Sequence, residues 1–367
     1  MADINALLHP TVQDQEGLTE FIEDLADIVP NVERDIARLK RTPEDKALIA
    51  NLFRALHNIK GDASICKVDV GVLIAHPIET LLSRLRGGEV AFSDLLAELI
   101  LLAMDRLELA VEALAAGKSF AHLKLVEMVN GLEQMAKATD AELDERSAQL
   151  IEVVTGFRPV HAGAQVRPAV VHSQQGSDST AVDLKFFRAL ATQFEDRSPL
   201  FKGRSGRLVR LALDTNVAAG KPVDPVQLEA AVYMHDVGMM FLPESVWLKV
   251  GHLTDEDKQA LRSHPTYGAG LLECTPNWLA AAQMVAQHHE MPDGAGYPAG
   301  LKDKDICAGA KILAIVDAFE AVTLKHSHRG QSRSLLRAIA EINACDNQFA
   351  PEWIGHFNAV VRRMVES

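Results

Sequence analysis

Apolar residues that recur every three or four positions dominate this chain, and this spacing is the strongest constraint on its fold. Between Leu18 and Leu39 the apolar side chains fall on one face of a helix. The same period returns between Leu48 and Ile59, and no stretch gives a convincing strand pattern. Leucine and alanine are the dominant apolar residues, and both favour helices over strands. The sequence therefore predicts an all-α protein.

The N-terminal part contains four helical patterns with short connections between them. Thr42 followed by Pro43 is a typical helix start, and Gly87 with Gly88 is a typical helix stop. We expect a kink at Pro30 in the first helix. Short connections place neighbouring helices antiparallel, which predicts a four-helix bundle. The expected helices cover residues 18–39, 42 to about 59, 70–86 and 93–116.

His57 lies on the flank of the second expected helix, beside its apolar stripe. Lys60 and Gly61 follow three and four positions later, so both neighbour His57 on the helix surface. An imidazole can take a phosphoryl group, a lysine can balance its charge, and a glycine leaves room for a partner. The pattern favours a phosphotransfer site, and an ordinary surface histidine is the alternative.

The stretch His57-Asn58-Ile59-Lys60-Gly61-Asp62-Ala63 resembles the motif of the histidine phosphotransfer (Hpt) family. Residues 75–86 resemble the next helix of that family, and the resemblance covers about residues 10–120. It implies a relay in which His57 exchanges phosphate with an aspartate on a separate receiver domain. Since the chain has no ATP-binding motif, the phosphate donor must be another protein. We assign His76 no transfer role.

Length, charge and cysteine usage limit the class of protein. A chain of 367 residues favours two domains, and a net charge of −13 argues against nonspecific binding to nucleic acid or anionic membranes. The four cysteines show no CxxC spacing, which suits a reducing cytoplasm. We see no signal peptide, and the most apolar segment, residues 95–104, is too short to span a bilayer. We therefore expect a cytoplasmic protein with no nucleic-acid or membrane partner.

A segment without helical periodicity separates two helical regions. It contains Pro159, Pro168 and a polar run at residues 173–180. It is either a flexible tether or an ordered arm that docks one domain on the other, and the sequence leaves both open. The expected organisation is a bundle with a trailing helix at 1–155, a linker at 156–182 and an all-helical domain at 183–367.

Histidines and aspartates with metal-ligand chemistry are distributed through the second domain. Imidazole and carboxylate groups hold iron, manganese or zinc. A carboxylate between two ions can bridge them, and paired metals suit phosphoester hydrolysis. Each residue alone has a structural alternative, such as a helix cap, a core histidine or an arginine partner. Together they predict a metal centre formed by His235, Asp236, His264, His288, His289 and Asp317.

A glycine- and proline-containing loop, residues 290–298, follows the paired histidines. Gly294 and Gly296 provide backbone freedom and Pro298 stiffens the exit, so the loop can approach a ligand closely. A His-rich surface turn is the alternative. The loop sequence is Glu290-Met291-Pro292-Asp293-Gly294-Ala295-Gly296-Tyr297-Pro298.

These ordered motifs resemble the HD-GYP family, the bacterial cyclic-di-GMP phosphodiesterases, over about residues 183–367. The resemblance implies a divalent transition metal, iron or manganese, in a helical domain that acts on cyclic di-GMP. It implies that Glu290 or Asp293 positions or shuttles protons. It also implies that Gly296, Tyr297 and Pro298 contact the nucleotide.

Three positions depart from the family pattern. Arg204 replaces a histidine ligand, and a guanidinium that keeps its proton cannot bind metal. Met239 replaces a lysine, and His326-Ser327-His328 replaces an Arg-x-Tyr. We therefore expect one impaired metal site, with Arg204 paired to Asp317, and one full site. The impaired site would use His235, Asp236 and Asp317, and the full site Asp236, His264, His288 and His289.

Three functions remain open from the sequence. The favoured one is a phosphorelay protein whose second domain is a partly degenerate output that binds metal, nucleotide or a partner. The alternative is an active metal-dependent cyclic-di-GMP phosphodiesterase. The third is a metalloprotein scaffold in which His57 is inert.

Overall fold

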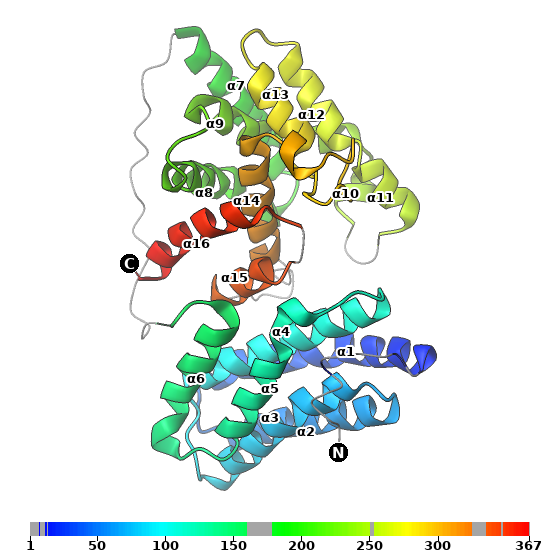
Figure 1. The fold of residues 1–367 in the computed structure, drawn as a ribbon, viewed down its shortest axis with the longest axis vertical. Helices are drawn as coiled ribbons and strands as arrows, with labels where there is room; N and C mark the ends of the chain where they lie inside the picture. Colours follow the sequence, from blue (N-terminus) through cyan, green and yellow to red (C-terminus); the bar gives the residue numbers. More distant parts are fainter. Residues whose placement is uncertain are drawn as a thin grey trace. The chain divides into compact units, whose positions relative to one another are not determined.

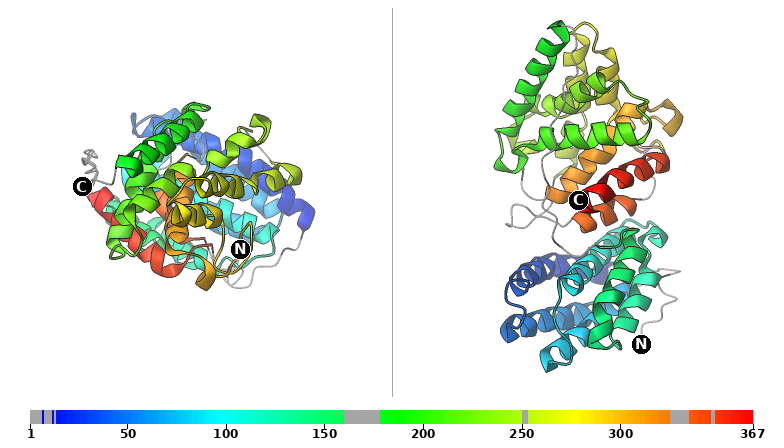
Figure 2. Two further views of the ribbon diagram at one scale, coloured as in Figure 1. Left: turned by 90° about the horizontal axis from the view of Figure 1, so that it is seen from above. Right: turned by 90° about the vertical axis from the view of Figure 1, so that its left-hand side faces the viewer.

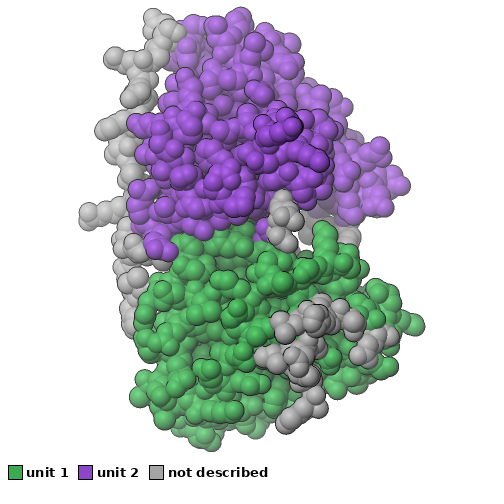
Figure 3. Space-filling view, in the orientation of Figure 1, with its two compact units in different colours: residues 1–161, 334–344 green, residues 162–333, 345–367 purple. Residues whose placement is uncertain are grey.

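The computed structural model describes residues 7, 12, 14–159, 178–249, 253–324, 335–345 and 348–366. Within these ranges the regular elements are all helices, and an isolated bridge joins Asp293 and Lys302, which confirms the all-α prediction. Among the helices described, none has the length and apolar character needed to traverse a bilayer. The structure divides into two compact units (Figure 3), with residues 1–161 and 334–344 in unit 1 and residues 162–333 and 345–367 in unit 2.

Unit 1 is built on a four-helix bundle. Each helix contacts the next in sequence and α4 packs back onto α1, so the apolar faces enclose one core. Figure 1 shows the four helices side by side, and the right-hand view of Figure 2 shows them from another side. They are α1 (Gln15–Leu39), α2 (Lys46–Ile65), α3 (Asp69–Gly87) and α4 (Asp94–Ala115), as the periodicity predicted.

Local capping signals explain where these helices begin and end. Gly88, with a φ of 74°, ends α3 in the left-handed conformation expected of a glycine stop. The predicted cap of α2 at Thr42 is wrong: Asp45 caps the helix, because its carboxylate accepts the N–H groups of Ala47 and Leu48. Pro30 lies inside α1, which continues to Leu39.

Two further helices follow the bundle where one helical pattern was expected. Thr139 and Glu142 form a capping box, which starts a new helix and divides the pattern. These helices are α5 (Leu125–Met135) and α6 (Asp140–Thr155), preceded by the short 3-10 turn η2 (Ala121–Leu123).

Unit 1 also includes a helix from late in the chain, α15 (Leu335–Asn343), which contacts α4 and α6. Its buried Arg337 donates two hydrogen bonds of 2.6 Å to Asp105 and one of 2.7 Å to Glu33. Residues 334–344 of the expected domain 183–367 group with unit 1, where Arg337 gives two buried carboxylates a cation.

Unit 2 contains the remaining helices. α7 begins before the expected boundary at residue 183, and residues 160–177 of the expected linker lie outside the described part of the chain. The α-helices are α7 (Asp178–Glu195), α8 (Arg204–Ala218), α9 (Pro225–Met234), α10 (Glu244–Trp247), α11 (Asp255–Leu261), α12 (His264–Glu273), α13 (Leu279–Gln287), α14 (Ala308–Leu324) and α16 (Pro351–Glu366). The 3-10 turns are η3 (Pro199–Phe201), η4 (Val237–Phe241) and η5 (Asp303–Asp305).

Two glycines bring η4 and α12 into close contact. A Cβ atom at Gly238 would lie 2.1 Å from the carbonyl oxygen of His264, and one at Gly268 would lie 2.9 Å from the carbonyl oxygen of Met234. Any side chain at Gly238 would push the two elements apart. The glycines therefore place the residue before η4, Asp236, beside the first residue of α12, His264.

Candidate metal centre and phosphotransfer site

Three buried histidines lie at helix ends and share one hydrogen-bond pattern. His235 and His288 directly follow α9 and α13, and His264 begins α12 just after α11 ends. Each ring places Nδ1 against the carbonyl three residues earlier. A carbonyl can only accept, so Nδ1 carries a proton in each ring, and Nε2 keeps its lone pair where the ring is neutral. The acceptors are Val232, Leu261 and Val285, at 2.7, 2.6 and 2.7 Å.

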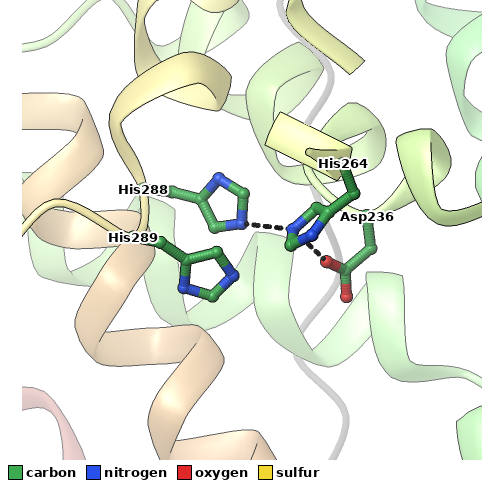
Figure 4. Close-up of side chains that lie close together, drawn as sticks. All are labelled: Asp236, His264, His288 and His289. Carbon is green, nitrogen blue, oxygen red and sulfur yellow. Dashed lines mark hydrogen bonds and ion pairs between the residues drawn. The ribbon is translucent and has the colours of Figure 1, made fainter. Parts of the chain in front are cut away.

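Asp236, His264, His288 and His289 form a cluster whose donor atoms lie within 4.8 Å of one another (Figure 4). Nε2 of His264 lies 3.3 Å from Nε2 of His288 and 3.4 Å from Oδ1 of Asp236. Oδ1 of Asp236 is buried and has no hydrogen-bond partner among the described residues. Lone pairs and an unsatisfied carboxylate oxygen that face one point fit a bound cation.

The protonation states also suit metal binding. Burial lowers the pKa of His264, lowers that of His288 well below its ordinary value and lowers that of His289 to about 4. Burial would raise the pKa of Asp236, but His235 and Arg204 hold it well below its usual range. Neutral imidazoles and an ionised carboxylate are the forms that coordinate metals.

A second group contains Arg204 together with His235, Asp236 and Asp317. Arg204 donates from Nη1 to Oδ2 of Asp236 at 2.6 Å and from Nη2 to Oδ1 of Asp317. The same Nη2 lies 3.2 Å from Nε2 of His235. The expected pairing of Arg204 with Asp317 is present, and the buried guanidinium also contacts Asp236 and His235.

Charges within the two groups balance when His235 is protonated. Asp236 and Asp317 contribute two negative charges and Arg204 one positive charge. Burial lowers the pKa of His235, but Asp236 and Asp317 raise it to about 9 with Arg204 in place, so the ring supplies the second positive charge at neutral pH. The residues fit one divalent cation at the cluster with three histidines, and the Arg204 group already holds a cation.

The loop after the paired histidines is held by Glu290. The buried carboxylate accepts the N–H of Ala299 at 2.7 Å and that of Leu301 at 2.8 Å. Because both oxygens accept backbone N–H groups, Glu290 holds the loop in place beside the cluster. Asp293 is exposed and accepts the N–H of Ala295 at 2.8 Å, which closes a turn.

Gly296 and Tyr297 bring the loop back onto the cluster. A Cβ atom at Gly296 would lie 2.3 Å from the backbone nitrogen of Met291, so this close approach requires glycine. The Tyr297 N–H donates to the His289 carbonyl at 3.1 Å, and its ring stacks on the His289 ring with centroids 4.8 Å apart. Pro298 follows in a cis peptide bond and is exposed.

In unit 1, His57 lies on the exposed surface of α2 and its Nδ1 is 2.6 Å from Oε1 of Glu79. Lys60 donates to the other oxygen of Glu79, which is buried on α3. An ionised carboxylate only accepts, so Nδ1 of His57 donates and Nε2 is left free. Glu79 was not predicted as a partner of His57, because the pairing joins two different helices. The only signal for it in the sequence was an acidic residue within the Hpt-like stretch 75–86.

Of the other two departures from the family pattern, the structure describes Met239 but not residues 326–328. Met239 lies half-buried in η4, directly after Gly238, and its thioether carries no charge. His326, Ser327 and His328 lie outside the described residues.

Comparison with known families assigns a domain to each part of the chain. A model of the Hpt domain matches residues 16–117, and a model of the HD domain matches residues 188–352. The chain is an Hpt domain followed by an HD domain. An Hpt domain implies phosphorelay partners. The buried histidine and aspartate clusters are consistent with an HD-domain metal centre.

The HD domain is related to those of HD-GYP cyclic-di-GMP phosphodiesterases. It is 31% identical over 134 residues to a cyclic di-GMP phosphodiesterase from Thermotoga maritima, a match that covers 36% of each chain. It is 38% identical over 97 residues to the cyclic di-GMP phosphodiesterase response regulator RpfG from Xanthomonas campestris, covering 26% of each chain. These matches therefore span well under half of each relative.

Among solved structures, an HDGYP protein from Bdellovibrio bacteriovorus aligns with 71% of this chain, and the alignment covers 79% of that protein. The identity is 15% and the TM-score is 0.36, which is too low to support a statement about this fold.

Proposed function

We propose that this chain is a phosphorelay protein in which His57 accepts phosphate from an aspartate of a receiver domain. The HD domain is the output, and it binds one divalent transition metal and a cyclic dinucleotide. The observation that supports the relay best is the fixed orientation of the His57 ring. Its Nδ1 donates to Glu79 at 2.6 Å, so Nε2 is the nucleophilic nitrogen.

The transfer step follows from this orientation. Nε2 of His57 attacks the phosphorus of an aspartyl phosphate, a new N–P bond forms, and the bond to the aspartate oxygen breaks. The aspartate leaves as a carboxylate, and the positive charge that forms on the imidazole is balanced by Glu79 through Nδ1. Lys60 neutralises the second Glu79 oxygen and stays close to the incoming phosphoryl group.

The surface around His57 suits a receiver domain. His57, Gly61 and Ile65 follow one another at four-residue spacing, so they share one face of α2. A Cβ atom at Gly61 would meet no atom within 4 Å, and Ile65 is 78% exposed. An exposed isoleucine beside an open backbone position provides apolar contact area next to the nucleophile.

A phosphotransfer assay tests the relay. Receiver domains carrying labelled phosphate are incubated with the wild-type chain, with His57→Ala and with His76→Ala. His76 is a matched control, because it is also exposed and lies 3.8 Å from Glu79. We expect label on the wild-type protein and the His76 variant but not on the His57 variant. Label that persists on His57→Ala, or that never reaches the wild-type protein from any receiver, would refute the relay.

The proposed output depends on the cluster in the HD domain. Asp236, His264, His288 and His289 would hold iron or manganese, and the bound ion would act as a Lewis acid toward a phosphoryl oxygen. Arg204 provides a fixed positive charge in the adjacent group, between Asp236 and Asp317. We propose one metal ion per chain, with the guanidinium in place of a second.

The second candidate is an active cyclic-di-GMP phosphodiesterase. It is favoured by the complete four-residue cluster and by relatives whose names state this activity. The test is incubation of the full chain with cyclic di-GMP and iron(II) or manganese(II) under reducing conditions, followed by product analysis. Turnover that disappears in His288→Ala would establish this function, and its absence would leave the HD domain as a binding output.

A further inference from the structure

Arg262 lies between two helices of the HD domain and close to the metal cluster in sequence. It follows α11 and stands two residues before His264. Its backbone N–H donates to the carbonyl of Lys258 at 3.1 Å, and His264 donates from Nδ1 to Leu261 at 2.6 Å. These bonds hold the backbone of Arg262 in a defined place relative to His264.

The Arg262 side chain reaches the cluster through one aromatic ring. Its guanidinium carbon lies 5.6 Å from the centroid of the Tyr297 ring. Tyr297 in turn stacks on His289, with ring centroids 4.8 Å apart. Arg262, Tyr297 and His289 therefore form a continuous series of contacts from the exposed surface to the candidate metal ligands. A guanidinium held over a ring keeps its N–H edges available for an anion.

Arg262 forms no ion pair with a carboxylate among the described residues. Arg197, Arg204 and Arg207 in the same domain each pair with a carboxylate. No carboxylate of the described residues forms an ion pair with Arg262, which is exposed and has the Tyr297 ring as its side-chain contact. In a chain with a net charge of −13, an exposed arginine beside a buried metal-type cluster and without an acidic partner is a candidate for ligand binding.

We propose that Arg262 binds a phosphate group of a cyclic dinucleotide that lies over the His289 side of the cluster. This inference rests on the proposed nucleotide-binding output of the HD domain. A cyclic dinucleotide carries two phosphodiester groups, so two cationic contacts can each bind one of them. The cluster with its metal provides one, and the planar guanidinium fork of Arg262 provides the other by binding two phosphate oxygens. Turn η4 next to the cluster contains no charged residue that could take this role.

The test is a binding measurement on the full-length, manganese(II)-loaded protein. Cyclic di-GMP is titrated calorimetrically into the wild-type chain, Arg262→Ala, Arg262→Lys and Lys258→Ala. Lys258 is the matched control, since it is an exposed cation one turn earlier and pairs with Asp255 at 3.3 Å. We expect affinity to fall about 10- to 100-fold in Arg262→Ala, less in Arg262→Lys, and by less than about two-fold in Lys258→Ala.

The outcomes separate the two proposals. If the wild-type protein binds no cyclic di-GMP, the nucleotide output itself fails and the role of Arg262 fails with it. If the wild-type protein and Arg262→Ala bind equally, only the role of Arg262 is refuted. Metal content and melting temperature are measured on every variant. A loss of bound manganese or of stability in Arg262→Ala would show that the residue supports the loop structure, which also refutes the proposal.

Discussion

Arg204 donates to Oδ2 of Asp236 at 2.6 Å, while Oδ1 of the same carboxylate faces Nε2 of His264 at 3.4 Å. The Asp236 carboxylate thus lies between the Arg204 guanidinium and the histidines of the candidate metal cluster. A carboxylate in this position can bridge two ions. Here the Arg204 guanidinium contacts Asp236 and Asp317 and offsets their buried negative charge.

We predict about one equivalent of bound transition metal in the wild-type protein. Arg204→His should raise this toward two, because it replaces a permanent cation with a ligand next to His235 and Asp317. The metal content of His264→Ala should fall below one equivalent, because the substitution removes a donor from the cluster of three histidines and Asp236. Elemental analysis after anaerobic purification measures all three, and two full equivalents in the wild-type protein would contradict the prediction.

Gly296→Ala should release the loop from the cluster. The new methyl group would lie 2.3 Å from the Met291 nitrogen, so the loop must move and the stacking of Tyr297 on His289 is lost. We expect weaker metal and nucleotide binding, measured by calorimetry. Gly270→Ala is the control: it lies in α12 with no atom within 4 Å of its Cβ position, and it should be neutral or stabilise by about 0.5–1 kcal/mol. Equal binding by both variants would show that the loop tolerates the methyl group.

Arg337→Met should destabilise unit 1 by about 3–5 kcal/mol, because it removes a buried cation that pairs with the carboxylates of Asp105 and Glu33. Hydrogen exchange of the α1 and α4 amides measures this loss of stability next to the substituted residue. Arg158→Ala breaks an exposed pair with Glu145 and should leave the stability of unit 1 nearly unchanged. A loss below about 1 kcal/mol in Arg337→Met would mean that the carboxylates find other partners.

Glu79 should make the Hpt domain more sensitive to acid. Burial would raise its pKa, but hydrogen bonds from Lys60 and His57 outweigh this and lower it below the ordinary 4.5. In the unfolded chain Glu79 therefore takes up its proton at a higher pH than in the folded one. The stability it contributes is present above pH 4.5 and is lost as the pH falls through the lowered pKa.

Glu79→Gln cannot titrate, so its melting temperature should change less than that of the wild-type protein between pH 7 and acidic pH. The melting temperature of unit 1 is measured for both proteins, with hydrogen exchange of the unit 1 amides as the readout. Glu89→Gln serves as the control, because Glu89 is largely exposed and its pair with Arg84 spans 3.2 Å at the surface. Parallel pH profiles for Glu79→Gln and the wild-type protein would argue against the role of Glu79.

Local features of this protein followed from the sequence alone. The helical period placed α1 to α4, and Gly88 ended α3 as expected. The spacing of His57, Lys60 and Gly61 placed them together on one helix surface. These predictions succeeded because helix periodicity, capping and side-chain neighbourhood depend on residues within about one turn. The order of the histidine and aspartate motifs likewise indicated a shared pocket.

The sequence indicated the pair of Arg204 with Asp317, but only the tertiary structure showed the other partners of the charged groups. Arg204 also contacts Asp236 and His235, and Arg337 pairs with Asp105, which is 232 residues away. Glu79 was not predicted as the partner of His57, because the pairing joins two helices. A buried charge must find an opposite charge wherever packing brings one, since desolvation without a partner is too costly. That requirement joins distant segments of this chain, such as α15 with α1 and α4 through Arg337.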